Sequence, residues 1–341
     1  MAKGRRGHPI VDSHIHLYPR SENGSIGWID PGHHLAGQWS VDQYRDATKT
    51  ASSSLSGFVI VEVNRTHDLE TGQADGWSGW RGALQEVAYM SRVALGEPRH
   101  GEGHGAEDSK RCLGLVPWAP VPSGPAVLER YLGSVRKVAG AAWPRVRGFR
   151  YLLQDSPCGL FQRSEFVDSV KMLGRRGFVF EICADHHRRG QSQLDDAVAL
   201  VELAHEGVRE SDQVTFVIEP SSPSYQAWAA AIEALGRSRN TYIKISGAFN
   251  ETSAEIRALA QDGSCSAVAE FMQPWFTTIL GAFGPERIMF GSDWPVCTVA
   301  MENPWACWRD VVEAMCVGAG LEEGDVGRVF SGTAKEAYRL L

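Results

Sequence analysis

The sequence predicts an α/β protein, a (β/α)8 TIM barrel that forms a single domain over residues 1–341. Two observations predict this fold class. Short apolar runs rich in β-branched residues alternate with segments whose apolar residues have helical spacing, and the alternation occurs eight times. The length of 341 residues suits one barrel with insertions, and no linker or low-complexity segment divides the chain.

The predicted strands are runs of aliphatic and aromatic residues, as in GFVIVEV at residues 57–63. They cover residues 10–17, 57–63, 112–117, 146–153, 177–183, 214–219, 241–246 and 287–292. The clearest predicted helices cover residues 82–95, 125–138, 164–175, 192–207, 224–236, 267–282 and 303–317. Two further helical segments, near 322–329 and 333–341, are expected to pack outside the last unit.

Two insertions interrupt the alternation, at residues 18–40 and 64–81. Both follow a predicted strand, so they lie on the barrel face that carries the C-terminal ends of the strands, where barrel enzymes have their active sites. We expect them to form lids; their aromatic, histidine and acidic residues include Trp28, His33, His34, Trp39, His67, Asp75, Trp77 and Trp80. A third excursion, residues 97–111, precedes strand three, and we expect a solvated loop on the opposite face.

Composition and charge exclude several classes of protein. The net charge of −7 and the lack of a dense basic stripe argue against a nucleic-acid partner. No run approaches the ~18 apolar residues of a membrane span, and the basic start of the chain has no apolar stretch of signal-peptide length behind it. Seven cysteines without CxxC spacing indicate free thiols in a reducing compartment. We expect a cytoplasmic protein with a small-molecule substrate, and a homo-oligomer is compatible with the sequence.

The first predicted strand carries two histidines, His14 and His16. Because side chains alternate along a strand, Asp12, His14 and His16 are expected on one face and the residues between them on the other. Two neighbouring imidazoles suit a divalent metal, since neutral imidazole is a good zinc ligand, and they also suit a polar wall for an anionic or carbonyl substrate. Histidines satisfied in the core are the alternative.

Polar and aromatic residues gather at the C-terminal ends of the other predicted strands. They are Glu62, Trp118, Arg147, Arg150, Glu181, Asp185, His186, Glu219, Lys244, Ser246 and Asp293. Charges buried there are costly unless they pair with each other, a metal or a substrate. Arg147 and Arg150 are three positions apart, so we expect one of them to face the lumen. Arg150 is the candidate, for a substrate or for a structural ion pair.

Two motifs, Val11-Asp12-Ser13-His14-Ile15-His16 and Phe290-Gly291-Ser292-Asp293-Trp294-Pro295, resemble those of the amidohydrolase-related family of the amidohydrolase superfamily. Within that family the chain looks most like the branch of fungal L-rhamnono-lactonase-like sugar lactonases. The resemblance extends to residues 114–118, 146–151, 185–187 and 243–247, so it covers nearly the whole chain. It implies that His14, His16 and Asp293 form the catalytic centre.

The chain departs from this family in strand six. Relatives carry a histidine in a motif ending in Asn-His or Asp-His, whereas Glu219 here is followed by Pro220. A metal centre formed by the two histidines and Asp293 would therefore lack one ligand, which Glu219 or His186 would have to replace. The family also resembles lactonases that work without a metal. One divalent ion, zinc first, and metal-free catalysis both stay open.

The resemblance implies a hydrolase that opens a lactone or a similar cyclic ester. Asp293 would act as general base on a water, and the strand-one histidines would stabilise the oxyanion directly or through a metal. A helix N-cap is the alternative role for Asp293. The candidate substrate-binding residues are Arg150, which could orient a carboxylate or hydroxyl, the tryptophans Trp118, Trp77 and Trp80, which could stack on a ring, and Glu219 and His186.

Three other functions stay open. A metal-dependent nonoxidative decarboxylase of an aromatic acid has similar end motifs in the same superfamily. A natural-product tailoring enzyme acting on a polyketide-like lactone would suit the eleven tryptophans. A catalytically silent barrel that binds a ligand would fit the missing strand-six histidine, although the retained histidines and Asp293 argue against it.

Overall fold

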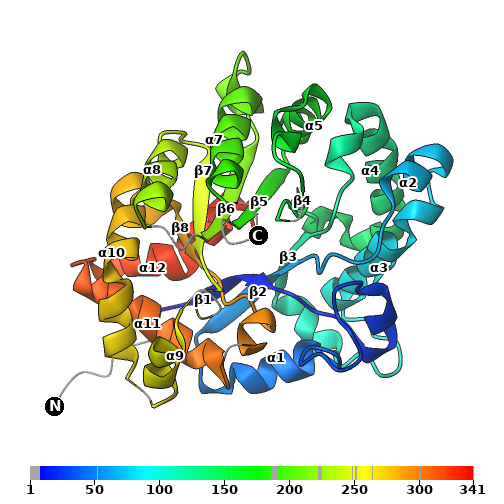
Figure 1. Cartoon of the computed structure of the whole chain (residues 1–341). Coiled ribbons are helices and arrows are strands. Elements are labelled where there is room, and N and C mark those ends of the chain that lie inside the picture. Colours follow the sequence, from blue (N-terminus) through cyan, green and yellow to red (C-terminus); the bar gives the residue numbers. More distant parts are fainter. Residues whose placement is uncertain are drawn as a thin grey trace.

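The computed structural model describes residues 8–51, 53–154, 156–185, 190–221, 225–247, 249, 252–262, 264–299 and 301–340. Within these residues, eight parallel strands follow one another around a ring (Figure 1). They are β1 (Ile10–Ile15), β2 (Leu55–Val61), β3 (Cys112–Val116), β4 (Gly148–Arg150), β5 (Val179–Asp185), β6 (Thr215–Ser221), β7 (Thr241–Ile245) and β8 (Ile288–Phe290).

Isolated bridges close the ring between its two hydrogen-bonded sheets, β1–β2–β3 and β4 to β8. Leu115 pairs with Val146, and Trp118 pairs with Arg150, which joins β3 to β4. Ile15 pairs with Trp294, which joins β1 to the segment after β8. The predicted (β/α)8 barrel is therefore confirmed.

Apart from the chain's last helix, the helices lie outside the strands, as the sequence predicts (Figure 1). They are α1 (Val41–Ala47), α2 (Leu69–Asp75), α3 (Arg81–Leu95), α4 (Pro125–Ala139), α5 (Ser164–Arg175), α7 (Gln191–His205), α8 (Tyr225–Gly236), α9 (Ala254–Gln261), α10 (Cys265–Phe283), α11 (Pro304–Gly318), α12 (Glu323–Gly327) and α13 (Thr333–Ala337). The predicted helices that follow strands two to eight begin and end within two residues of α3, α4, α5, α7, α8, α10 and α11. Apolar spacing predicts them well because each buries one face against the barrel.

The two largest apolar cores of the barrel lie between strands and helices and inside the lumen. The lumen core consists of side chains from six strands and the chain's last helix, namely Val11, Val59, Val61, Val116, Val179, Val217, Met289, Ala334, Ala337 and Tyr338. α13 thus packs against residues inside the barrel, whereas the sequence predicted a helix outside the last unit. Its flanking Tyr338 donates a hydrogen bond of 2.5 Å to Glu181 on β5.

β1 does not keep the regular alternation that the sequence predicted. Its pairing with β2 shifts register between Asp12 and Ile15. Before this shift, Val11 faces the lumen core, and Asp12 accepts hydrogen bonds from Tyr44 of α1 and Trp305 of α11, which lie outside the strands. The expectation that Asp12 shares a face with the histidines is wrong, because a bulge reverses the direction of the side chains that follow it.

The excursions of the chain contact the strand ends closely. In the first insertion, Trp28 Nε1 donates to Val63 O over 2.8 Å, and His34 Nε2 lies 3.0 Å from Thr298 Oγ1, beyond β8. Its function as a lid stays a prediction, as does that of residues 64–81. The 97–111 segment is not a solvated loop throughout, since Glu102 and His104 are buried and Glu102 pairs with Arg92.

Candidate active site

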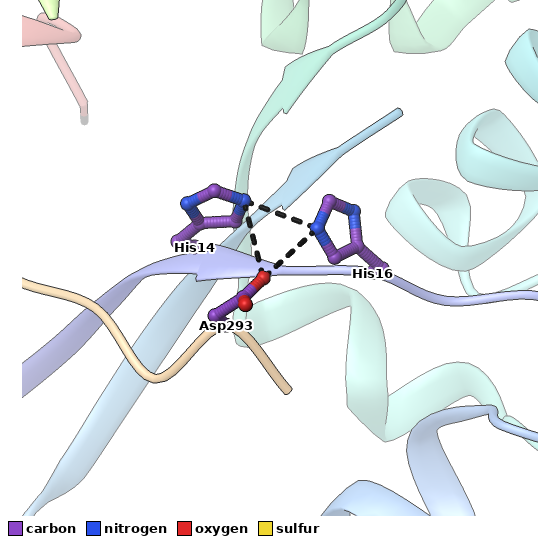
Figure 2. Close-up of side chains that lie close together, drawn as sticks. All are labelled: His14, His16 and Asp293. Carbon is purple, nitrogen blue, oxygen red and sulfur yellow. Dashed lines mark hydrogen bonds and ion pairs between the residues drawn. The ribbon is translucent and has the colours of Figure 1, made fainter. Parts of the chain in front are cut away.

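Three side chains from the two ends of the chain meet at the C-terminal end of the barrel (Figure 2). His14 and His16 project from the end of β1, and Asp293 lies in the segment after β8. The two Nε2 atoms are 3.1 Å apart, and Asp293 Oδ1 lies 3.2 Å from His16 Nε2 and 3.7 Å from His14 Nε2. Both imidazoles are buried, while 14% of the Asp293 side chain is exposed.

The partners of the other ring nitrogens indicate the tautomer of each histidine. His16 Nδ1 lies 3.0 Å from Val61 O, which can only accept, so this nitrogen carries the proton. His14 Nδ1 lies 3.1 Å from Glu219 Oε1, an ion-pair contact, and we place the proton of this ring on Nδ1, where it faces the carboxylate. Both Nε2 atoms then direct lone pairs toward each other and toward Asp293 Oδ1. A cation between them would stabilise this arrangement.

The spacing of these three atoms fits a single metal ion. Two ligands of a tetrahedral zinc with bonds of ~2.05 Å lie ~3.3 Å apart. The separations of 3.1, 3.2 and 3.7 Å found here scatter around that value. Among the residues that the structure describes, His14, His16 and Asp293 are the group of histidine, cysteine and carboxylate side chains close enough to hold an ion. Glu219 lies outside this group, on the far nitrogen of His14, and His186 is not among the described residues.

The charges around the centre also favour a divalent cation. Arg150 Nε pairs with Glu62 Oε1 over 2.6 Å, and Lys244 Nζ pairs with Glu181 Oε2 over 2.8 Å, so these four buried groups neutralise each other. The carboxylates of Glu219 and Asp293 are left beside the two neutral imidazoles. Ionising both carboxylates in a buried site is costly, and one divalent ion would offset that cost.

Burial and neighbouring charges separate the proton affinities of these groups. Burial raises the pKa of Asp293 to about 7 and, with the nearby Arg150, lowers the pKa of His16 to about 4. Burial would also raise the pKa of Glu219, but His14, Lys244 and a hydrogen bond from Ser246 hold it below its usual range. Two neighbouring carboxyl groups whose pKa values are shifted in opposite directions are typical of acid–base sites.

A family model described as amidohydrolase matches residues 11–340. The chain belongs to the amidohydrolase family. This membership confirms the resemblance drawn from the two end motifs and, with it, the prediction of a hydrolase.

Two relatives of this amidohydrolase match it over nearly their whole length. An L-rhamnono-gamma-lactonase from Scheffersomyces stipitis is 27% identical over 97% of this chain and 98% of its own. An L-fucono-1,5-lactonase from Burkholderia multivorans is 26% identical over 97% of this chain and 96% of its own.

Solved structures share the fold. A Burkholderia multivorans amidohydrolase with bound zinc has a TM-score of 0.71 at 22% identity, covering 98% of this chain and 100% of its own. A 2,6-dihydroxybenzoate decarboxylase from Rhizobium has a TM-score of 0.58 at 11% identity, covering 98% of each chain. At these identities the likeness concerns the fold alone. Among the described residues of the amidohydrolase, no helix is both long and apolar enough to cross a bilayer.

Of the residues of the amidohydrolase predicted to bind substrate, some are buried and one is exposed. Arg150 is buried and engaged by Glu62, which is the structural ion pair that the sequence left as an alternative. Trp118 is also buried, and the half-buried ring of His67 covers it at 4.3 Å. Trp80 packs in the apolar core against Tyr131, whereas Trp77 is 50% exposed.

The backbone around Asp293 leaves space for its carboxylate. Asp293 has a φ of 57°, in the left-handed region that Asp and Asn tolerate better than most residues. Gly247, after β7, has a φ of 64°, and a β-carbon there would lie 3.1 Å from Asp293 Oδ2. A β-carbon on Gly291 would lie 3.0 Å from His14 Cβ. Sequence reasoning missed both glycines as site residues, although their positions within two residues of a strand's C-terminal end were a usable signal.

Proposed function

We propose that the chain hydrolyses the ring ester of a sugar-acid lactone. The observation that carries this proposal is the convergence of His14, His16 and Asp293 at the C-terminal end of the barrel. Two full-length relatives with lactonase names narrow the substrate class to lactones of L-sugar acids. A decarboxylase function has support from fold similarity only.

In the proposed reaction, Asp293 accepts a proton from a water while the water oxygen attacks the lactone carbonyl carbon. The ring carbon–oxygen bond then breaks, and the protonated Asp293 returns its proton to the departing ring oxygen. The product is an open-chain hydroxy acid. The 14% exposure of the Asp293 side chain, next to imidazoles that are almost fully buried, makes it the member of the group that a water can reach most readily.

The histidines orient the reacting groups. His14 is fixed by Glu219, which Ser246 holds in turn, and His16 is fixed by Val61 O. Both rings therefore keep the lone pairs of their Nε2 atoms directed toward Asp293 Oδ1, where together they could hold a cation.

One divalent ion, zinc first, would be held by His14 Nε2, His16 Nε2 and Asp293 Oδ1. When bound, it would supply Lewis-acid stabilisation of the developing oxyanion. Glu219 is better suited to orient His14 than to act as the missing ligand, because it faces the opposite nitrogen.

Substrate contacts follow from what remains exposed at the barrel mouth. We propose that His67 and Trp77 contact the sugar-acid chain, with Trp118 supporting His67 from below. Arg150 would support the site as the partner of Glu62 rather than bind the substrate as a free guanidinium, since the Glu62 carboxylate neutralises it.

The test is a hydrolysis assay with L-rhamnono-1,4-lactone and L-fucono-1,5-lactone, following acid release at constant pH. Asp293→Asn is the control, because asparagine tolerates the same backbone conformation. We expect lactone opening that falls at least ~100-fold in the variant while its thermal midpoint stays near that of the parent. Carbon dioxide release from a dihydroxybenzoate, without lactone opening, would contradict the proposal.

A further inference from the structure

Two half-buried cysteines lie in α10 and α11, the helices that precede and follow β8 in the chain, and take no part in the proposed hydrolysis. Cys265 is the first residue of α10, and Cys307 lies in the first turn of α11, 42 positions later. Their sulfur atoms are 3.2 Å apart. The two helices pack along each other outside the barrel (Figure 1). A disulfide has a sulfur–sulfur bond of ~2.05 Å, so a small movement would join them.

The first turn of α11 is tied to the ends of the strands that carry the active site. Trp308, next to Cys307, donates from Nε1 to Gly291 O over 2.9 Å and to Ile245 O over 3.2 Å. Trp305 donates to Asp12 on β1 over 2.8 Å. A bond at Cys307 would therefore hold the turn that supports the segment between β8 and Asp293.

We propose that Cys265 and Cys307 are a modification site, at which a peroxide or a small disulfide such as oxidised glutathione forms a reversible bond that clamps the starts of α10 and α11 together. This role is independent of the substrate of the barrel. The sequence predicted free thiols, and all seven cysteines are thiols in the structure; the proposal adds that two of them can join on oxidation.

The chemistry balances with either oxidant. The Cys265 thiolate attacks hydrogen peroxide, giving a sulfenic acid and hydroxide; the Cys307 thiol then displaces the sulfenic oxygen as water, and the disulfide forms. With oxidised glutathione, Cys265 forms a mixed disulfide and releases one glutathione, and Cys307 releases the second. Cys307 acts second because burial, together with the adjacent Cys265, raises the pKa of its thiol to about 12.

The remaining cysteines differ from this pair in accessibility or surroundings. Cys112, Cys183, Cys297 and Cys316 are buried, which shields them from an oxidant. Cys158 is exposed, and its sulfur lies 3.1 Å from the hydroxyl of Ser192. Cys158 is therefore a matched control, since it is accessible and its sulfur contacts an oxygen.

The experiment treats the purified full chain with a small excess of hydrogen peroxide or oxidised glutathione, then alkylates and digests it without reductant. We expect thiols titrated in denaturant to fall from seven to five, and a peptide that joins Cys265 to Cys307. Closing a loop of this size should raise the thermal midpoint by on the order of several degrees, and dithiothreitol should reverse the rise.

Cys158→Ser should keep the cross-linked peptide and the rise in thermal midpoint, whereas Cys265→Ser should lose both. Alkylation of Cys265 and Cys307 as separate free thiols after oxidant would overturn the proposal, as would their separate conversion to sulfinic acids. A thermal rise that persists in Cys265→Ser would also overturn it. The peptide map of the unsubstituted protein decides the matter even if a variant fails to fold.

Discussion

Replacing Asp12 with alanine should remove a large share of the stability of the barrel. The carboxylate is fully buried and accepts four hydrogen bonds, from Tyr44 Oη at 2.9 Å, Trp305 Nε1 at 2.8 Å, Ser292 N at 2.9 Å and His14 N at 3.3 Å. These donors come from α1, α11, the β8 end and β1, so one side chain joins the two ends of the chain.

The size of the effect follows from two opposing terms. Each buried donor left without an acceptor costs ~1–3 kcal/mol, and only the Tyr44 hydroxyl is free to rotate toward another partner. Against this, alanine recovers the cost of burying a carboxylate, which is several kcal/mol; burial indeed raises the pKa of Asp12 despite its four donors. We expect a net loss of ~3–5 kcal/mol, set against a total stability of ~5–15 kcal/mol.

Urea unfolding followed by tryptophan fluorescence measures this loss. Asp12→Asn should cost less, ~1–3 kcal/mol, because the amide keeps one acceptor oxygen. Asp12→Ala combined with Trp305→Phe should show a coupling energy of ~1–2 kcal/mol. The exposed Asp42→Ala is the control and should change stability by less than ~1 kcal/mol. Asp12→Ala within ~1 kcal/mol of the parent protein, or strict additivity with Trp305→Phe, would refute the reasoning.

Three further outcomes are expected. Gly247→Ala should lower turnover at least ~10-fold and reduce stability by ~1 kcal/mol or more, because the added β-carbon would press on Asp293. Initial rates measure turnover and urea unfolding measures stability; unchanged turnover would contradict the prediction. Glu219→Gln should weaken zinc retention ~10–100-fold in dialysis against a chelator, because the carboxylate orients His14. Glu219→Asp should restore part of the retention. Equal retention in the parent protein and both variants would argue against this role. Lys244 holds the pKa of Glu181 below its usual value of 4.5 despite burial. The contribution of the Glu181 carboxylate to stability is therefore present above pH ~4.5 and is lost as the pH falls through its lower pKa in the folded protein. Thermal midpoints between pH 7 and 3 should therefore fall more steeply for the parent than for Glu181→Gln; parallel curves would exclude this contribution.

The sequence predicted those features that depend on the spacing of apolar residues. Strand order and helix positions follow from burial of one face of each element, and the histidines and Asp293 follow from their place at strand ends. The direction of Asp12 could not be predicted, because the register break after it is set by pairing with β2 and not by residue type. Alternation describes an isolated regular strand only.

The role of Glu219 shows a second limit of prediction. Sequence position indicates that Glu219 and His14 share one end of the barrel, but not which ring nitrogen the carboxylate faces. The burial of α13 against the lumen core was equally out of reach, since an apolar helix face does not indicate whether its partners are strands or helices. Contacts between distant segments, such as Cys265 with Cys307, have no local signal at all.

The closure of the barrel between Ile15 and Trp294 has a consequence for biosynthesis. These residues are separated by most of the chain, and ribosomes add ~5–20 residues per second, so β1 waits on the order of 15–60 s for its second neighbour. During that interval its free edge and the valines of the open lumen are exposed to other nascent chains. Dependence on chaperones should therefore be greatest before the segment after β8 leaves the ribosome.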